Sequence, residues 1–223
     1  MLPSRLSAPI VVLVILLSDP RIALVPVMDC GEPLAEVRSI PELGLDLREQ
    51  DPDGAFGRVR TGVLQRLQAA TEHLPHRARL LIVEGHRTSS EQARRFALQV
   101  DRLRASGITD PIELRRQASA FVSPVEVAPH CAGAAVDLTL TDTNGDELDM
   151  GGPVNGHRTG DEQTCPMDAP ELHTQARNNR GLLKSAMTAS GFVNYPTEWW
   201  HWSYGDRYWA FITKAGAARY GAI

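Results

Sequence analysis

Clustered and alternating apolar positions mark the strands of this chain. Residues 79–83 (RLLIV) form a short, mostly aliphatic run, which is typical of a buried strand. Residues 134–140 alternate instead, with aliphatic side chains on one face and small or polar ones, Asp137 among them, on the other. The predicted strands are 11–16, 22–27, 79–83, 134–140 and 199–204.

Helical spacing of apolar residues predicts three longer helices. The first covers 56–74, and the second starts at Thr88 or Ser89 and runs to about residue 105. The third covers 171–190 and is followed by a glycine, and a shorter helix starts with Pro111. Because helices and strands do not alternate regularly, the predicted fold class is α+β, a single domain with a small central antiparallel sheet flanked by helices.

Two polar stretches predict loops. Residues 142–146 (DTNGD) have the composition of a tight turn. Residues 150–170 are rich in Gly, Pro, Asp and Asn, which predicts a long surface loop. Long ordered loops often carry functional residues, so the second stretch is a candidate region for substrate contacts.

The N-terminal segment allows two interpretations. Residues 9–17 (PIVVLVILL) are apolar, as in a signal peptide, but no small-x-small cleavage site follows, which favours a buried strand. The run is also shorter than the roughly 20 apolar residues that span a bilayer, so we expect no stable membrane insertion. We therefore divide the chain into an apolar segment, 1–18, and one domain, 19–223, and expect a cytoplasmic protein, with export as the alternative.

Composition narrows the class of protein. The 223 residues are 43% hydrophobic and 22% charged, which is ordinary for a globular domain. A net charge of -4 gives no reason to expect nucleic acid as a partner. Three cysteines without a CxxC pair favour reduced thiols over a disulfide framework.

Common catalytic motifs such as GxGxxG, the P-loop, GxSxG and HExxH are absent. Two other segments stand out. In the first, 128–137 (APHCAGAAVD), His130 follows a proline and Asp137 lies on the polar face of a predicted strand. A buried carboxylate among small residues needs a partner, and a cation would satisfy it.

The second segment, 198–202 (EWWHW), places an acid and an imidazole among three tryptophans. Residues three apart on a regular strand face opposite sides, so Glu198 and His201 share a site only if the chain bends between them. Two histidines and one aspartate form a plausible catalytic zinc set, and Glu198 is then the candidate base. The alternatives are hydrogen-bonded histidines without a metal and a surface ion pair between Glu198 and His201.

The chain resembles the D-alanyl-D-alanine dipeptidases, zinc peptidases related to the vancomycin-resistance dipeptidases, from about residue 18 onward. The resemblance is carried by SDPRIALVPV, LLIVEGHR, APHCAGAAVDLTL, ELDMG and GFVNYPTEWWHWSYGDRYWA. It implies that His130, Asp137 and His201 hold one zinc ion and that Glu198 is the acid/base. It also implies that Arg87 stabilises the developing oxyanion; a surface salt bridge is the alternative role for that arginine.

Three departures concern the substrate. Ala128 and Pro129 replace a serine pair, and Asn155 replaces an aspartate suited to the substrate ammonium. His86-Arg87-Thr88 replaces a more usual Tyr-Arg-Pro. The metal set and the base match the family, whereas the groups that anchor the substrate differ, so the preference for a free dipeptide is expected to be weaker or changed.

We therefore predict a zinc-dependent dipeptidase that hydrolyses the small dipeptide D-Ala-D-Ala, with Asn155 as a substrate-binding residue. A D,D-carboxypeptidase that trims peptidoglycan stem peptides is the nearest alternative. Others are a non-catalytic metal-binding module, which would not need Glu198, and a zinc amidase or phosphoesterase with the same ligands.

Overall fold

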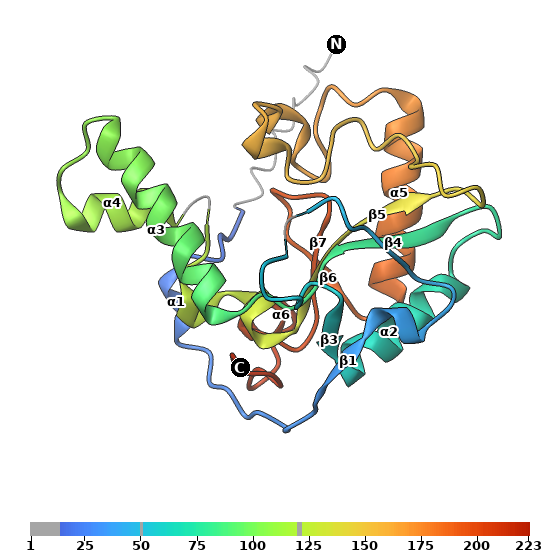
Figure 1. Ribbon diagram of the computed structural model, residues 1–223, viewed down its shortest axis with the longest axis horizontal. Helices are drawn as coiled ribbons and strands as arrows, with labels where there is room; N and C mark the ends of the chain where they lie inside the picture. Colours follow the sequence, from blue (N-terminus) through green and yellow to red (C-terminus); the bar gives the residue numbers. More distant parts are fainter. Residues whose placement is uncertain (1–13, 50, 120–121) are drawn as a thin grey trace, which may run out of the picture.

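A five-stranded sheet runs through the centre of the computed structural model, which describes residues 14–49, 51–119 and 122–223 (Figure 1). Its strand order is β2-β4-β5-β7-β6. All neighbours are antiparallel except β2 and β4, which are parallel, so the sheet is mixed and not purely antiparallel. The strands are β2 (Gly44–Leu45), β4 (Arg79–Glu84), β5 (Ala135–Thr141), β6 (Val193–Asn194) and β7 (His201–Ser203).

A smaller antiparallel sheet pairs β1 (Leu34–Glu36) with β3 (Arg58–Arg60) beside the central one. Within the described ranges, five short 3₁₀ helices complete the connections. They are η1 (Val37–Ser39), η2 (Val125–Val127), η3 (Pro129–Ala132), η4 (Gly156–Arg158) and η5 (Glu162–Thr164).

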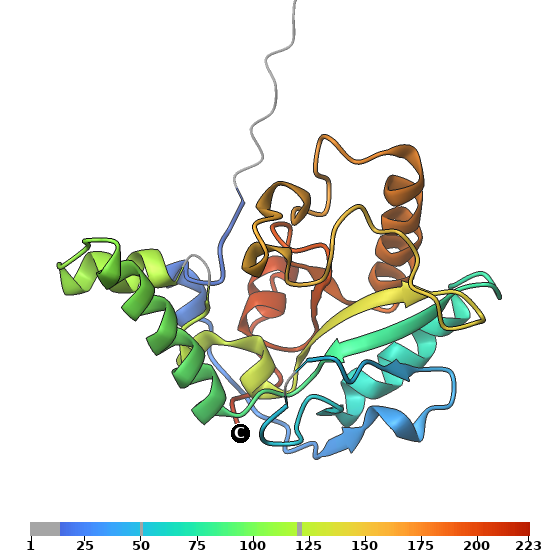
Figure 2. The same cartoon turned by 45° about the horizontal axis from the view of Figure 1, so that its top comes forward.

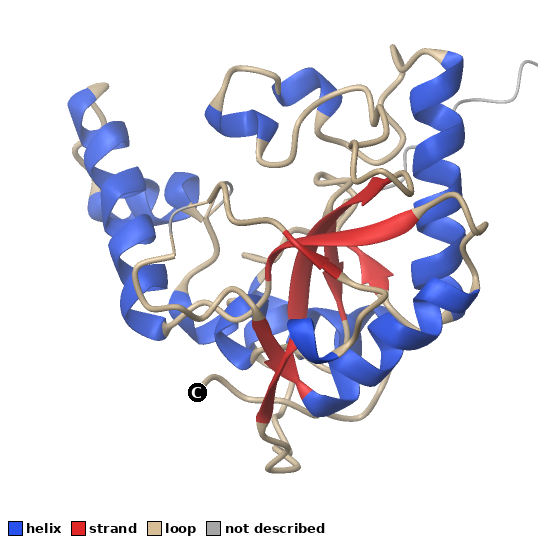
Figure 3. Cartoon of the chain, turned by 45° about the vertical axis from the view of Figure 1, so that its right-hand side comes forward, coloured by secondary structure: helices blue, strands red, loops and turns tan. Residues whose placement is uncertain are grey.

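Two helices, α2 (Thr61–Glu72) and α5 (Thr174–Ala189), pack together against the central sheet (Figure 3). Their apolar residues share one core with Val136, Leu138 and Leu140 of β5, which are fully buried. Because side chains alternate along a strand, Asp137 and Thr139 face the opposite side. The core therefore fixes which face of β5 is free to carry a site.

The remaining helices lie away from that core. Helices α3 (Ser89–Ala105) and α4 (Pro111–Ala118) form a hairpin that projects from the body of the molecule (Figure 2). Short helices α1 (Pro20–Ala23) and α6 (Arg207–Thr213) pack against each other. No helix in the described ranges is both long enough and apolar enough to cross a membrane.

The α+β class and most of the expected elements are confirmed. The strand at 79–83, the strand at 134–140, the helix capped by Thr88 and the helix that starts at Pro111 lie within a residue or two of their expected positions. The turn at 142–146 is closed by the carboxylate of Asp142, which accepts hydrogen bonds from two backbone N–H groups. Residues 150–170 form the expected loop, with η4 and η5 within it.

Other boundaries were predicted wrongly. Residues 22–27 form no strand, because Asp19 caps a helix that Pro20 starts, and only Val27 makes an isolated bridge. The helix expected over 56–74 starts only at Thr61, since residues 58–60 pair as β3. The helix at 171–190 starts at Thr174, and the last strand is limited to 201–203. Most of the strand expected at 11–16 falls outside the described residues, and its described part, 14–16, is not a strand.

Candidate metal centre and active-site pocket

Strand pairing places two of the candidate ligands side by side. Asp137 on β5 and His201 on β7 are direct partners in the antiparallel register, so their side chains lie on the same face. His130 comes from η3, which turns back into β5 at Gly133, where φ is 62°. Only a residue that tolerates positive φ fits this turn, because the left-handed region strains other side chains.

The three side chains converge on one point. Nδ1 of His201 lies 2.9 Å from Oδ1 of Asp137, and Nε2 of His130 lies 3.2 Å from His201 Nδ1 and 3.3 Å from the same Asp137 oxygen. All three residues are buried. Among the described residues they are the group whose donor atoms are close enough together to hold a metal ion.

The spacing fits a tetrahedral ion. Donor atoms with bonds of about 2.0–2.1 Å occupy tetrahedral corners that are about 3.3 Å apart, close to the observed distances. Nδ1 of His130 is 2.7 Å from the backbone oxygen of Gly85, and an N–H bond there leaves Nε2 free to act as a ligand. Burial opposes ionisation of Asp137, but the two imidazoles hold its pKa well below the usual value. One carboxylate and two imidazoles are ligand types that suit zinc.

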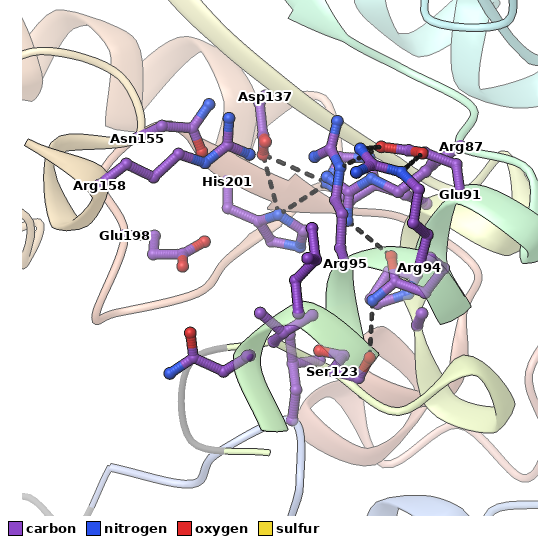
Figure 4. A pocket seen from close by; sticks show the side chains of 18 of the residues that line it. Arg87, Glu91, Arg94, Arg95, Ser123, Asp137, Asn155, Arg158, Glu198 and His201 are labelled. Carbon is purple, nitrogen blue, oxygen red and sulfur yellow. Dashed lines mark hydrogen bonds and ion pairs between the residues drawn. The ribbon is translucent and has the colours of Figure 1, made fainter. Parts of the chain in front are cut away.

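Glu198 reaches the same pocket from the turn that precedes β7. Its backbone N–H donates to Tyr195, and its carbonyl oxygen accepts from His201, so the chain bends between the two residues as expected. Its side chain faces the pocket but lies outside the three-atom cluster (Figure 4). Withdrawal from water, with Asp137 nearby, raises the pKa of Glu198 to about 7 against the attraction of His201. Such a carboxyl can both accept and release a proton near neutral pH.

Arg87 follows β4 and is buried in the pocket wall. Its Nε donates to Glu84 at 2.6 Å, and its Nη1 donates to the side-chain oxygen of Gln92, also at 2.6 Å. Glu84 is fully buried and also pairs with Arg95, while Gln92 donates to the backbone oxygen of Ser123. The guanidinium is therefore held on one side, and no hydrogen bond joins its Nη2 to another described residue.

Asn155 lies in the predicted loop and is buried against the pocket, with a φ of 60°. Its Nδ2 approaches Oε1 of Glu49 at 3.5 Å, and Nη1 of Arg158 donates to Oε2 of Glu49 at 3.1 Å. Figure 4 shows Asn155 and Arg158 directed towards the side of the pocket that holds Asp137 and His201. The structure thus brings all six predicted site residues to one cavity of about 820 Å³.

Sequence reasoning missed three residues that line this cavity, Glu49, Gln92 and Arg158, and it also missed Glu84, which pairs with Arg87. Glu84 had a usable signal, since an acid within a buried aliphatic strand needs a cationic partner and Arg87 is three residues away. The other three lie in ordinary polar sequence and gave no signal.

The cysteines take no part in the cluster. None of the three forms a disulfide bond, as expected, and Cys131 is buried beside His130. Burial raises the pKa of the Cys131 thiol to about 11, and its sulfur is not one of the donor atoms that converge in the cluster.

The buried donor cluster on the mixed sheet is thus a candidate metal centre with an adjoining pocket. A family model described as D-Ala-D-Ala dipeptidase (Peptidase_M15) matches residues 59–214. The chain therefore belongs to this family and is a metallopeptidase.

Individual relatives agree with this assignment. A D-alanyl-D-alanine dipeptidase from Synechocystis is 31% identical over 84% of this chain and 87% of its own length. One from Escherichia coli is 40% identical over 32% of this chain and 35% of its own.

Two solved structures have lower identity. VanYB in complex with D-Ala-D-Ala is 17% identical, with a TM-score of 0.44 over 90% of this chain and 95% of the other. The LD-carboxypeptidase LdcB is also 17% identical, with a TM-score of 0.45 over 86% of this chain and 76% of the other.

Proposed function

We propose that this protein hydrolyses the dipeptide D-Ala-D-Ala to two D-alanines, with one zinc ion held by His130, Asp137 and His201. The observation that carries the proposal is the convergence of three buried donor atoms within 2.9–3.3 Å, next to a separate carboxyl group with a raised pKa. A catalytic zinc site uses three protein ligands and needs a base that is not a ligand. The family membership supplies the substrate class.

Each residue has a distinct task. The metal, when bound, supplies Lewis-acid polarisation of the scissile carbonyl and lowers the pKa of water. Glu198 accepts the proton of the attacking water and then delivers it to the leaving amine. Arg87 faces the developing oxyanion with a charge that needs no proton transfer, and Glu84 and Gln92 hold its guanidinium in place.

One observation favours a second candidate, a D,D-carboxypeptidase that acts on stem peptides. The cavity volume of about 820 Å³ is near the upper end of the roughly 300–1,000 Å³ typical of ligand pockets. A dipeptide would occupy only part of it. The remaining space, along α3, would accommodate the rest of a longer peptide.

A substrate panel separates these functions. Zinc-loaded protein is given D-Ala-D-Ala, its L,L isomer and a pentapeptide stem that ends in D-Ala-D-Ala, and released alanine and bound zinc are measured. Hydrolysis of the free D,D-dipeptide at the highest kcat/KM supports the proposal. Preference for the pentapeptide would establish the carboxypeptidase instead. No hydrolysis of either by protein that holds stoichiometric zinc would reject both.

A further inference from the structure

Five carboxylates line the cavity, and their partners determine which one is free to bind a cationic group of the substrate. They are Glu49, Glu91, Asp137, Glu162 and Glu198. Asp137 belongs to the donor cluster, and Glu198 is the proposed base. Glu91 binds Arg94 through both carboxylate oxygens and Arg95 through one, so its charge is already neutralised. Glu49 and Glu162 remain.

These two acids differ in how they are held. Glu162 lies in η5 with an exposed side chain, and no ion pair or hydrogen bond fixes its carboxylate within the described ranges. Glu49 lies in the segment after β2 and is held from the opposite loop. Asn155 approaches one of its oxygens and Arg158 donates to the other. Glu49 is therefore the carboxylate with a defined position.

Glu49 also retains the capacity to accept hydrogen bonds. A carboxylate has about four acceptor positions, and the two neighbours occupy one on each oxygen. The Nδ2 group of Asn155 is directed at Glu49, so its Oδ1 is left as a neutral acceptor beside the acid. An ammonium with three N–H donors can use both groups, whereas Asn155 alone offers no negative charge.

We propose that Glu49 binds the α-ammonium of the substrate, with Asn155 as a second acceptor and Arg158 as the residue that orients Glu49. This inference rests on the proposed dipeptidase function and names its specificity-determining residue. Arg158 also lowers the negative potential at Glu49, so the contribution of Glu49 to the binding free energy of the ammonium is moderate. The carboxylate comes from a segment 106 residues away from Asn155 and is absent from every motif of the site.

The test compares two substrates that differ by one group. D-Ala-D-Ala carries the ammonium, whereas propanoyl-D-alanine has the same scissile amide and lacks only the amino group. We expect the parent protein to prefer D-Ala-D-Ala. Glu49→Gln should lower kcat/KM for D-Ala-D-Ala about 10- to 100-fold, mainly through KM, as expected for loss of a charged hydrogen bond. It should leave kcat/KM for propanoyl-D-alanine within about twofold, because that substrate has no ammonium to bind.

Two further variants sharpen the result. Glu162→Gln is the matched control and should change neither substrate. Asn155→Asp in the Glu49→Gln background returns a carboxylate to the same place, at a φ that aspartate tolerates, and should restore most of the selectivity. The role of Glu49 would be overturned if Glu49→Gln lost activity equally on both substrates. It would also be overturned if Glu162→Gln showed the selective loss, or if the parent protein hydrolysed both substrates equally well. Hydrolysis of neither substrate by the zinc-loaded parent would instead overturn the proposed function itself.

Discussion

The two sides of the cavity are built in different ways. His130, Asp137 and His201 are buried and come from η3 and the paired strands β5 and β7. Glu49 and Arg158 come from connecting segments, and their side chains are 30% and 37% exposed. Strands hold side chains with little freedom, while loops move and vary more easily. The sheet side is thus suited to precise chemistry, and the loop side to substrate choice.

This contrast predicts where each kind of kinetic change originates. Substitutions on the sheet side should reduce metal content or kcat, because they affect groups that act in the transition state. Substitutions on the loop side should act mainly on KM and on the choice between substrates. The comparison of D-Ala-D-Ala with propanoyl-D-alanine in Glu49→Gln tests this expectation for the loop side.

The largest effect is expected for His201→Ala. Removal of one of three ligands leaves a two-ligand site, so zinc content should fall far below one per chain and activity to assay background. Metal analysis of the purified variant measures this directly. His76→Ala, at an exposed histidine of the surface, is the matched control and should keep both zinc and activity. Stoichiometric zinc in His201→Ala would show that the ligand set is wrong.

Glu198→Gln should retain zinc and lose turnover. Loss of general acid–base assistance typically lowers the rate about 100- to 10,000-fold, and the upper end is expected because one residue handles both proton transfers. The decrease should appear in kcat with little change in KM. Loss of zinc in this variant would make Glu198 a ligand. Parental turnover would leave the protein as a metal-binding module without this mechanism.

A smaller decrease is expected when the support of Arg87 is removed. Gln92→Leu keeps a similar volume but deletes the acceptor that holds Nη1 of Arg87, so kcat should fall about 10-fold with KM nearly unchanged. The control is Gln99→Leu, on the same helix and in the cavity wall but without a bond to Arg87. Steady-state kinetics and thermal melting of both variants separate a loss of position from a loss of stability. A KM effect without a kcat effect would contradict the role of Arg87 in the transition state.

The smallest effect concerns the stability of the metal-free protein. The pKa of Glu198 in the folded protein is about 7 against an ordinary value of 4.5, so folding favours the protonated form. That stabilisation is present below about pH 4.5 and is lost as the pH rises through 7. The shift corresponds to at most about 3.4 kcal/mol, and partial exposure reduces it to about 1–2 kcal/mol.

Glu198→Gln, which cannot ionise, should therefore gain about 1–2 kcal/mol in the free energy of unfolding relative to the parent at pH 8. The gain should shrink towards pH 5. Urea denaturation of both proteins after chelation measures it. A difference that does not change with pH would mean that Glu198 is ionised at pH 5 in the folded protein.

Local sequence predicted those elements whose determinants are local. A cap at Thr88, a proline at 111 and the alternation around Asp137 depend on neighbouring residues, and these elements were confirmed. The error at 22–27 arose because an apolar run was given more weight than the capping signal of Asp19. The helix start at Thr61 depended on the pairing of β3 with β1, which the helical pattern does not encode.

The candidate site divides in the same way. The donor set and Glu198 lie in two short motifs, so the sequence indicated them, and the structure brings them together. Glu49 could not be found from sequence, because its partners Asn155 and Arg158 are 106 and 109 residues away. In the sequence Gln92 looks like any polar residue of a helix, and only in the folded protein does its side-chain oxygen accept a hydrogen bond from Arg87. Pairwise contacts between distant loops and helices leave no periodic signal.

The separation of the donor residues along the chain also links metal capture to the order of folding. His201 is 64 residues from Asp137 and 71 from His130, and the pairing of β5 with β7 brings it to both, since the turn at Gly133 holds His130 beside β5. An unfolded chain presents no preformed three-donor set, so a zinc ion held by these donors would bind the native state and stabilise it. Contacts this distant form slowly because loop closure is entropically costly. During refolding, zinc should therefore bind after β5 and β7 have paired, which makes it a reporter of the completed sheet and not a nucleus for it.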